Sequence, residues 1–359
     1  MHGSWLRSRL AHVRLYAGLV GVAIALSAAA IGVAVAYDLP LRDPDGLAGP
    51  TYVRLPAILG ACFLLDVLPR VWRRRRGAPS LTTSFWIVAK ERWPAHRIQL
   101  VLIGLGSWYL AYVAFRNLKG FVPFVRDGTA DASLLRLDRE IAMGDDPADI
   151  LHQVLGTEAA AHFLSFVYVA WIVFIPLSLA AALVWTRDAR RGIWYVTAVS
   201  FDWMLGAATY YLVPSVGPIY ERPGSFAELP DTASSRLAGV LLDARLEVLA
   251  DPHSSEQVQT IAAFASLHVG ILVTAALVAH LSGLALAVRW GLWLFLGLTV
   301  LATVYLGWHY LLDAIAGAVL GALGVWLAAR TNGIPLHRHV PASPPAGPYG
   351  RSQTPGSTA

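Results

Sequence analysis

The chain has 359 residues, of which 56% are hydrophobic and only 14% are charged, and its formal net charge is +5. Soluble domains carry about 25% charged residues, so this composition excludes an ordinary soluble protein and predicts an all-α polytopic membrane protein. The single cysteine, Cys62, excludes a disulfide framework and a cysteine-based metal site.

Membrane-spanning helices need about 20 mostly apolar residues. In chain order, eight segments meet this requirement: 13–37, 52–71, 98–115, 160–185, 193–213, 263–286, 291–308 and 311–329. We expect the last six to form a catalytic core over residues 98–330. The first two, with a cytoplasmic interfacial segment at 84–93, make up an N-terminal part over residues 1–97.

Two further segments are not expected to cross the membrane. Residues 131–155 mix charged and apolar residues at helical spacing, which predicts an amphipathic helix on the outer surface, broken near Gly144 to Pro147. The tail, 331–359, is rich in Pro, Ser and Gly and is predicted to be disordered.

Arginine and lysine mark one side of the membrane. They gather at five places: the N-terminus, 73–96, 186–191, 287–290 and the C-terminal tail. Eight spans bring all five groups to the same side, which the positive-inside rule assigns to the cytoplasm. We therefore predict an integral protein with both termini in the cytoplasm. The Ala, Arg and Gly bias favours a bacterial plasma membrane, and the position of the basic residues beside apolar spans argues against nucleic-acid binding.

Three polar groups lie at the outer ends of separate predicted spans. They are "RNLKGFVPFVRD" with Arg116, Lys119 and Arg126, "FASLHVG" with Ser266 and His268, and "WHYLLD" with His309 and Asp313. Asp313 follows His309 by one helical turn, so both side chains share a face. A carboxylate on one imidazole nitrogen leaves the other nitrogen free to act as a nucleophile or a base.

The remaining polar residues suit phosphate chemistry. His268 can protonate a leaving oxygen, while Lys119, Arg116 and Arg126 can bind the non-bridging oxygens of a phosphate. Together the residues predict phosphoryl transfer through a phosphohistidine, with no metal and no other cofactor.

Four stretches resemble a known family. "SLHVG" and "YLGWHYLLDAIAG" resemble the second and third motifs of the type 2 phosphatidic-acid phosphatase superfamily, closest to its inositol phosphorylceramide synthase-like branch. "YVAFRNLKGFVPF" resembles the first-motif region, and "LVPSVGPIYERP" resembles a proline-rich loop of that branch. The resemblance implies that His309 is the nucleophile, Asp313 its partner, His268 the proton donor to the leaving group and Lys119 a phosphate ligand.

Two positions depart from the phosphatase form of these motifs. Leu267 stands where the second motif has glycine, and Thr303 stands where the third has an arginine six residues before its histidine. Both departures favour the synthase-like branch. They also remove one phosphate ligand, and we expect Arg116, Arg126 or Arg222 to take its place.

Several of these residues have a plain structural alternative. Ser266 is either a phosphate ligand or an N-terminal helix cap. The proline-rich loop either faces the substrate or is an ordinary stiff turn. Its candidate substrate-facing residues are Pro214, Ser215, Tyr220 and Arg222.

The leading hypothesis is a membrane-embedded phosphotransferase for lipid phosphate or phosphodiester headgroups, with its active site on the extracytoplasmic face. Its partners are membrane lipids, a lipid substrate and a hydroxyl acceptor; the oligomeric state is not fixed by the sequence. If water attacks instead, the same site is a lipid phosphate phosphatase.

A proton-coupled transporter is the next alternative. The proton relays of such transporters lie near the bilayer midplane, whereas these residues map to span ends. A metal site of His309, Asp313 and His268 is disfavoured by the nearby cations.

Overall fold

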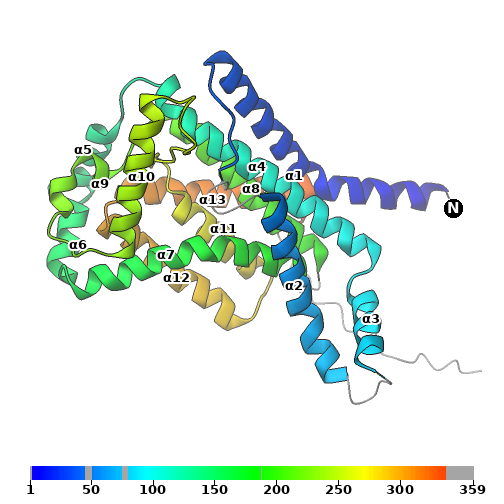
Figure 1. Ribbon diagram of the computed structural model, residues 1–359. Helices are drawn as coiled ribbons and strands as arrows, with labels where there is room; N and C mark the ends of the chain where they lie inside the picture. The colour runs from blue at the N-terminus through cyan, green and yellow to red at the C-terminus, as the bar shows by residue number, and fades with distance from the viewer. Residues whose placement is uncertain (1, 45–50, 75–79, 187, 337–359) are drawn as a thin grey trace, which may run out of the picture.

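The computed structural model describes residues 2–44, 51–74, 80–186 and 188–336. These residues form helices and connecting loops and contain no strand (Figure 1), which confirms the predicted all-α class. The predicted disordered tail lies, from residue 337 onwards, outside the described residues.

Helices occupy all eight predicted spans. They are α1 (His2–Ala36), α2 (Thr51–Arg74), α4 (Ala95–Val125), α7 (Ala159–Ala180), α8 (Ala189–Leu212), α11 (Leu267–Leu281), α12 (Leu286–Tyr305) and α13 (Leu311–Asn332). A short π-helix, η3 (Ala181–Trp185), continues α7.

Within the described ranges, five helical segments are long and apolar enough to cross a membrane. They are Leu15–Ala36, Ala95–Val125, Ala159–Trp185, Leu286–Tyr305 and Leu311–Asn332. Helix α11 is apolar but has only 15 residues, while α2 and α8 have 24 residues each and carry more charged side chains. The protein is therefore an integral, polytopic membrane protein, and the count of eight crossings stays a prediction.

Helix α4 continues ten residues beyond its predicted end at residue 115. The prediction was wrong because Arg116 and Lys119 resemble a span boundary. In the folded chain these two cations lie between buried apolar residues of the same helix, Leu118 and Phe121 among them. The apolar face keeps this part of the chain helical, so both cations belong to a helix rather than to a loop.

Short helices gather at one end of the bundle (Figure 1). They are α5 (Asp131–Ile141), α6 (Pro147–Leu155), α9 (Pro218–Glu221), the 3₁₀ turn η4 (Pro223–Phe226) and α10 (Ala233–Ala250). The break between α5 and α6 is confirmed, since Met143 and Gly144 have φ angles of 58° and 108°. Helix α3 (Leu81–Arg92), the predicted interfacial segment, lies toward the opposite end.

The N-terminal helices differ in how they pack. Buried side chains of α1, such as Leu19 and Leu26, join the main apolar core with residues of α4, α8, α11 and α13. Helix α2 instead packs against α3, where the Asp66 carboxylate accepts hydrogen bonds from the side chains of Arg92 and Trp93. Helix α1 thus supports the same core that holds the candidate site.

Glycines bring α11 and α13 into backbone contact. A Cβ atom on Gly317 would overlap the carbonyl oxygen of Ser266, and one on Gly321 would overlap the carbonyl oxygen of Gly270. Small residues allow such close approach between membrane helices. This contact sets the start of α11, which carries His268, beside the first turn of α13.

We expect Gly317→Ala to lower the melting temperature of the protein in detergent. The added methyl group must push α11 away from α13, and overpacking of this kind costs about 1–3 kcal/mol. Gly297→Ala in α12 is the matched control, because no atom lies within 4 Å of a Cβ placed there. Equal melting temperatures for the two variants would contradict the close-contact interpretation.

Candidate active site

His309 and Asp313 form the predicted pair at the junction of α12 and α13. The Nδ1 atom of His309 lies 3.2 Å from Oδ2 of Asp313. The same oxygen accepts the backbone N–H of Tyr310 at 3.1 Å, so the carboxylate also caps its own helix. Both side chains are buried, with 5% and 0% exposure. A carboxylate only accepts hydrogen bonds, so His309 holds its proton on Nδ1 and keeps a lone pair on Nε2.

His268 meets His309 directly. Its Nδ1 atom lies 2.9 Å from Nε2 of His309. Because that Nε2 carries the lone pair, the Nδ1–H of His268 is the donor. The imidazole of His268 packs against Trp171, with ring centroids 4.1 Å apart, and the indole N–H of Trp171 donates to the carbonyl oxygen of His268 at 2.9 Å.

The three side chains therefore form one hydrogen-bonded series that runs from His268 through His309 to Asp313. The sequence predicted His309 as the nucleophile and His268 as the proton donor to the leaving oxygen of the same phosphate. The structure brings them together but leaves no space between the two facing nitrogens. Across the part of the chain that the structure describes, no group of three or more His, Cys, Asp or Glu side chains is arranged to hold a metal ion.

A cavity of about 540 Å³ opens beside the two histidines. Its walls are rich in aromatic rings, which include Tyr112, Phe115, Tyr168, Trp171, Trp203 and Tyr210. The rings stack against one another and against the site; Tyr168 lies parallel to Trp308 at 4.7 Å between centroids. The size of the cavity is in the range of pockets that bind small organic molecules.

Two cations face this cavity from α4. The Nζ atom of Lys119 lies 4.9 Å from the centre of the Tyr210 ring, and Arg116 lies over the ring of Tyr112 at 5.8 Å. In the described ranges neither cation forms an ion pair with a carboxylate. Partly buried cations without a counterion favour an anionic ligand, and a phosphate would supply the missing charge.

The other two candidate arginines lie elsewhere. Arg126 is exposed at the C-terminal end of α4 and does not line the cavity. Arg222 forms an ion pair with Asp146 at 2.6 Å, so its charge is already compensated. Of the three arginines expected to replace the missing third-motif arginine, Arg116 is the one that faces the cavity.

Ser266 and the proline-rich loop have mainly structural contacts. The hydroxyl of Ser266 is fully buried and accepts the backbone N–H of Val269 at 3.4 Å, as the cap of α11. In the loop, Ser215 Oγ accepts the N–H of Phe264 at 2.9 Å. The carbonyl of Pro214 accepts the N–H of Ala130 at 2.7 Å. Tyr220 is the predicted loop residue that lines the cavity.

Two carboxylates that the sequence did not single out support this region. Asp131 accepts the backbone N–H groups of Val216 and Gly217 at 3.0 and 2.9 Å. Asp138 accepts the first two N–H groups of α13. Burial raises the pKa of Asp138 to about 6. Both residues lie on the buried face of α5. In the sequence, their spacing of seven residues already places them on one face of a helix, and this pattern could have identified them.

A family model described as the PAP2 superfamily matches residues 132–327, which is more than half of the chain. Neither the curated proteins nor the solved structures that were searched give a match. The matched range contains His268, His309 and Asp313 but begins after Arg116 and Lys119.

Proposed function

The chain belongs to the PAP2 superfamily, and from this premise we propose that it is a membrane-embedded phosphotransferase. It acts on lipid phosphate or phosphodiester headgroups through a phosphohistidine at His309. One observation carries this proposal: the hydrogen-bonded series of His268, His309 and Asp313 ends beside a cavity lined by two cations that have no ion-pair partner among the described residues.

The first half-reaction moves the phosphoryl group to the protein. The Nε2 lone pair of His309 attacks phosphorus, and the bond from phosphorus to the leaving oxygen breaks. The Nδ1 proton of His268 moves to that oxygen, so the leaving group departs as a neutral alcohol. Asp313 stabilises the positive charge that develops on the His309 imidazole.

The second half-reaction reverses these roles. A hydroxyl group of the acceptor attacks the phosphorus and transfers its proton to His268, while the bond from phosphorus to Nε2 breaks. Arg116 and Lys119 bind the non-bridging oxygens in both halves, because their charges offset the charge that builds up on phosphorus.

The direct contact between the histidines has a mechanistic consequence. Two nitrogens 2.9 Å apart leave no space for a phosphate, so the substrate must separate them before attack. Once the contact opens, the N–H of His268 loses its acceptor on His309 and becomes available to the leaving oxygen. Binding of the phosphate thus exposes the nucleophile and the acid in one step.

Transfer and hydrolysis differ only in what attacks the phosphohistidine. The cavity volume of about 540 Å³ and its aromatic walls support transfer, because they offer a second organic molecule a largely dry site. Hydrolysis by water is the second candidate, and membership of the PAP2 superfamily supports it. The inositol phosphorylceramide synthase-like branch, with a lipid or sugar hydroxyl as acceptor, is the form that we propose.

We place the active site on the extracytoplasmic face. Arg73 and Arg74 end α2 next to α3, toward the end of the bundle opposite the short helices (Figure 1). The positive-inside rule assigns this arginine-rich end to the cytoplasm. That assignment supports an outer position for α5, α6 and α10, and for the junction of α12 and α13.

The test is to trap the intermediate. Purified protein in detergent is mixed with phosphatidic acid or phosphatidylinositol, each radiolabelled at phosphorus, and quenched in alkali, where phosphohistidine survives. We expect label on His309. A chase with water, glycerol or inositol then separates the two candidates, because a hydroxyl acceptor that accelerates loss of label supports transfer. Absence of label with every lipid, despite measurable turnover, would reject the phosphohistidine mechanism.

We expect Lys119→Met to reduce kcat/KM by about 10²–10³-fold, the usual cost of removing one charge-stabilising donor from a transition state. Methionine keeps most of the length of the side chain and removes the ammonium group that lies over the Tyr210 ring. Arg126→Met removes the same charge from the same helix outside the cavity, and we expect near wild-type rates. Equal losses in both variants would mean that Lys119 acts only through the general positive potential.

A further inference from the structure

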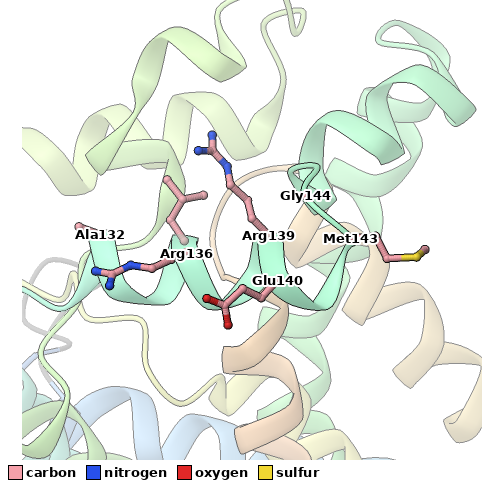
Figure 2. Close-up of a pocket in the computed structure, with 7 residues that line it drawn as sticks. Ala132, Arg136, Arg139, Glu140, Met143 and Gly144 are labelled. Atoms are coloured by element: carbon pink, nitrogen blue, oxygen red, sulfur yellow. The ribbon is translucent and has the colours of Figure 1, made fainter.

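Helix α5 has two unlike faces. Figure 2 shows Arg136, Arg139 and Glu140 projecting from this helix. They line a surface hollow of about 490 Å³, which shares no lining residue with the active-site cavity. The opposite face is buried and holds two carboxylates, Asp131 and Asp138. Burial of two carboxylates costs folding free energy unless each accepts hydrogen bonds from specific partners. The partners of Asp131 and Asp138 therefore indicate the role of α5.

Asp138 binds the start of α13. One carboxylate oxygen accepts the N–H of Leu311 at 2.6 Å, and the other accepts the N–H of Leu312 at 2.9 Å. These groups belong to the first turn of a helix, where N–H groups have no partner within the helix and carry partial positive charge. Leu311 and Leu312 are the two residues between Tyr310 and Asp313, so the bonds hold the segment that carries the candidate pair.

Asp131 holds the opposite side of the same junction. It accepts N–H groups from Val216 and Gly217. Both residues belong to the proline-rich loop, and further along the same loop the N–H of Ile219 donates to the carbonyl oxygen of Gly307 at 2.8 Å, just before His309. Gly217 has a φ angle of 95° and lies against the carbonyl of Trp308, so the loop fits closely there.

We propose that Asp138 is a positioning residue for catalysis: its carboxylate, held on α5, fixes the first turn of α13 and thereby the orientation of Asp313 towards His309. This inference rests on the proposed function of His309. Asp138 touches neither a reacting atom nor the cavity; it acts through the backbone of Leu311 and Leu312. The two-oxygen contact requires the ionised carboxylate, because a protonated oxygen is a poor acceptor.

The surroundings of Asp138 define when the carboxylate is ionised. The pKa of Asp138 is raised to about 6 as the net result of opposing effects: burial raises it most, the N–H groups of Leu312 and Leu311 lower it, and the nearby carboxylates of Asp313 and Asp146 add to the rise. Asp146 lies at the start of α6 and pairs with Arg222. Above about pH 6 both oxygens accept, and below it one of them carries a proton, so the contact weakens as the pH falls.

The test compares Asp138→Asn with the wild-type protein over a range of pH, using the labelled phosphatidic acid and phosphatidylinositol of the trapping experiment. An amide offers one acceptor instead of two. We expect kcat to fall about tenfold at about pH 7.5 with little change in KM, because a lost hydrogen bond to a charged group has this size. The ratio of wild-type to variant kcat should approach one at about pH 5, where the wild-type carboxyl is protonated. Taking the ratio cancels any pH dependence that the two proteins share.

Asp145→Asn is the matched control. Asp145 is exposed and lies just after α5, and its replacement by Asn removes the same negative charge. We expect a wild-type rate at every pH.

Leu311→Pro removes the N–H donor itself. It does so at the first helical position, where proline is tolerated and where the extended conformation of Tyr310 suits it. Leu311→Ala separates loss of the side chain from loss of the donor. We expect the effects of Asp138→Asn and Leu311→Pro to be strongly non-additive, since both remove one contact.

Hydrogen exchange gives a readout that does not depend on turnover. In Asp138→Asn, the amides of Leu311 and Leu312 should exchange faster, while those in the middle of α13 stay protected. Unchanged kcat together with unchanged exchange would overturn the positioning role while leaving the phosphohistidine proposal intact. Wild-type protein that turns over none of the labelled lipids would overturn the proposed function and, with it, this inference. A uniform tenfold loss that does not vary with pH would also reject it.

Discussion

A His309→Ala variant will form no phosphoenzyme, and its turnover will fall by at least about 10⁴-fold. His309 is the group that presents an unprotonated nitrogen, Nε2, at the edge of the cavity, because Asp313 holds the proton on Nδ1. Alanine leaves the aromatic walls and both cations in place. Lipid binding should therefore persist, and a binding assay with labelled phosphatidic acid separates lost chemistry from lost affinity.

His280→Ala provides the control for His309→Ala. His280 lies near the far end of α11 and is exposed, so its loss should affect neither labelling nor turnover. If His309→Ala still accumulates alkali-stable label, another side chain accepts the phosphoryl group. That result would remove the central step of the mechanism, whatever the rate of the variant.

Replacing His268 by Gln will slow phosphoenzyme formation by about 10²–10⁴-fold, the usual contribution of a general acid. The loss should depend on the leaving group, since a poor leaving group such as a lipid alkoxide needs the proton most. An aryl phosphate, whose phenolate leaves without a proton, should recover most of the rate. A rapid-quench measurement of label with both substrates tests this.

The His268 variant also probes the resting contact. Glutamine cannot reproduce the 2.9 Å bond from Nδ1 to His309 together with the ring packing on Trp171. Some of the loss will therefore reflect a displaced His309, and that part is the same for both substrates. An equal loss with the alkyl and the aryl phosphate would show that His268 positions its neighbour and does not act as the acid.

The apolar spans and the His309–Asp313 spacing were readable from the sequence because both depend on local order. Runs of apolar residues predict helices wherever a membrane must be crossed, and two side chains four residues apart meet on any helix. The convergence of His268 with this pair followed from topology, since all three lie at span ends on one side. Their direct contact did not, because ring orientation depends on the packing of Trp171 and Tyr168.

The limits of the sequence were set by contacts between distant segments. Arg222 is unavailable to a phosphate because Asp146, 76 residues earlier, compensates its charge. Asp138 reaches a backbone N–H 173 positions away, and no local pattern marks that partner. The extension of α4 was missed for a related reason. A charged residue ends a span only when it faces lipid, whereas Arg116 and Lys119 face an internal cavity.

The glycine contact between α11 and α13 has a consequence for how substrate preference can change. Because carbonyl and glycine meet directly, the main chain fixes how far α11 lies from α13, and only the imidazole side chains move when a substrate separates them. The aromatic side chains that α4 contributes to the cavity wall, such as Tyr112 and Phe115, lie outside this contact between α11 and α13. Exchange of these rings can therefore reshape the pocket for a different headgroup while the backbone distance between α11 and α13 stays the same. Substrate preference can change at the cavity walls, and the glycine contact must be kept.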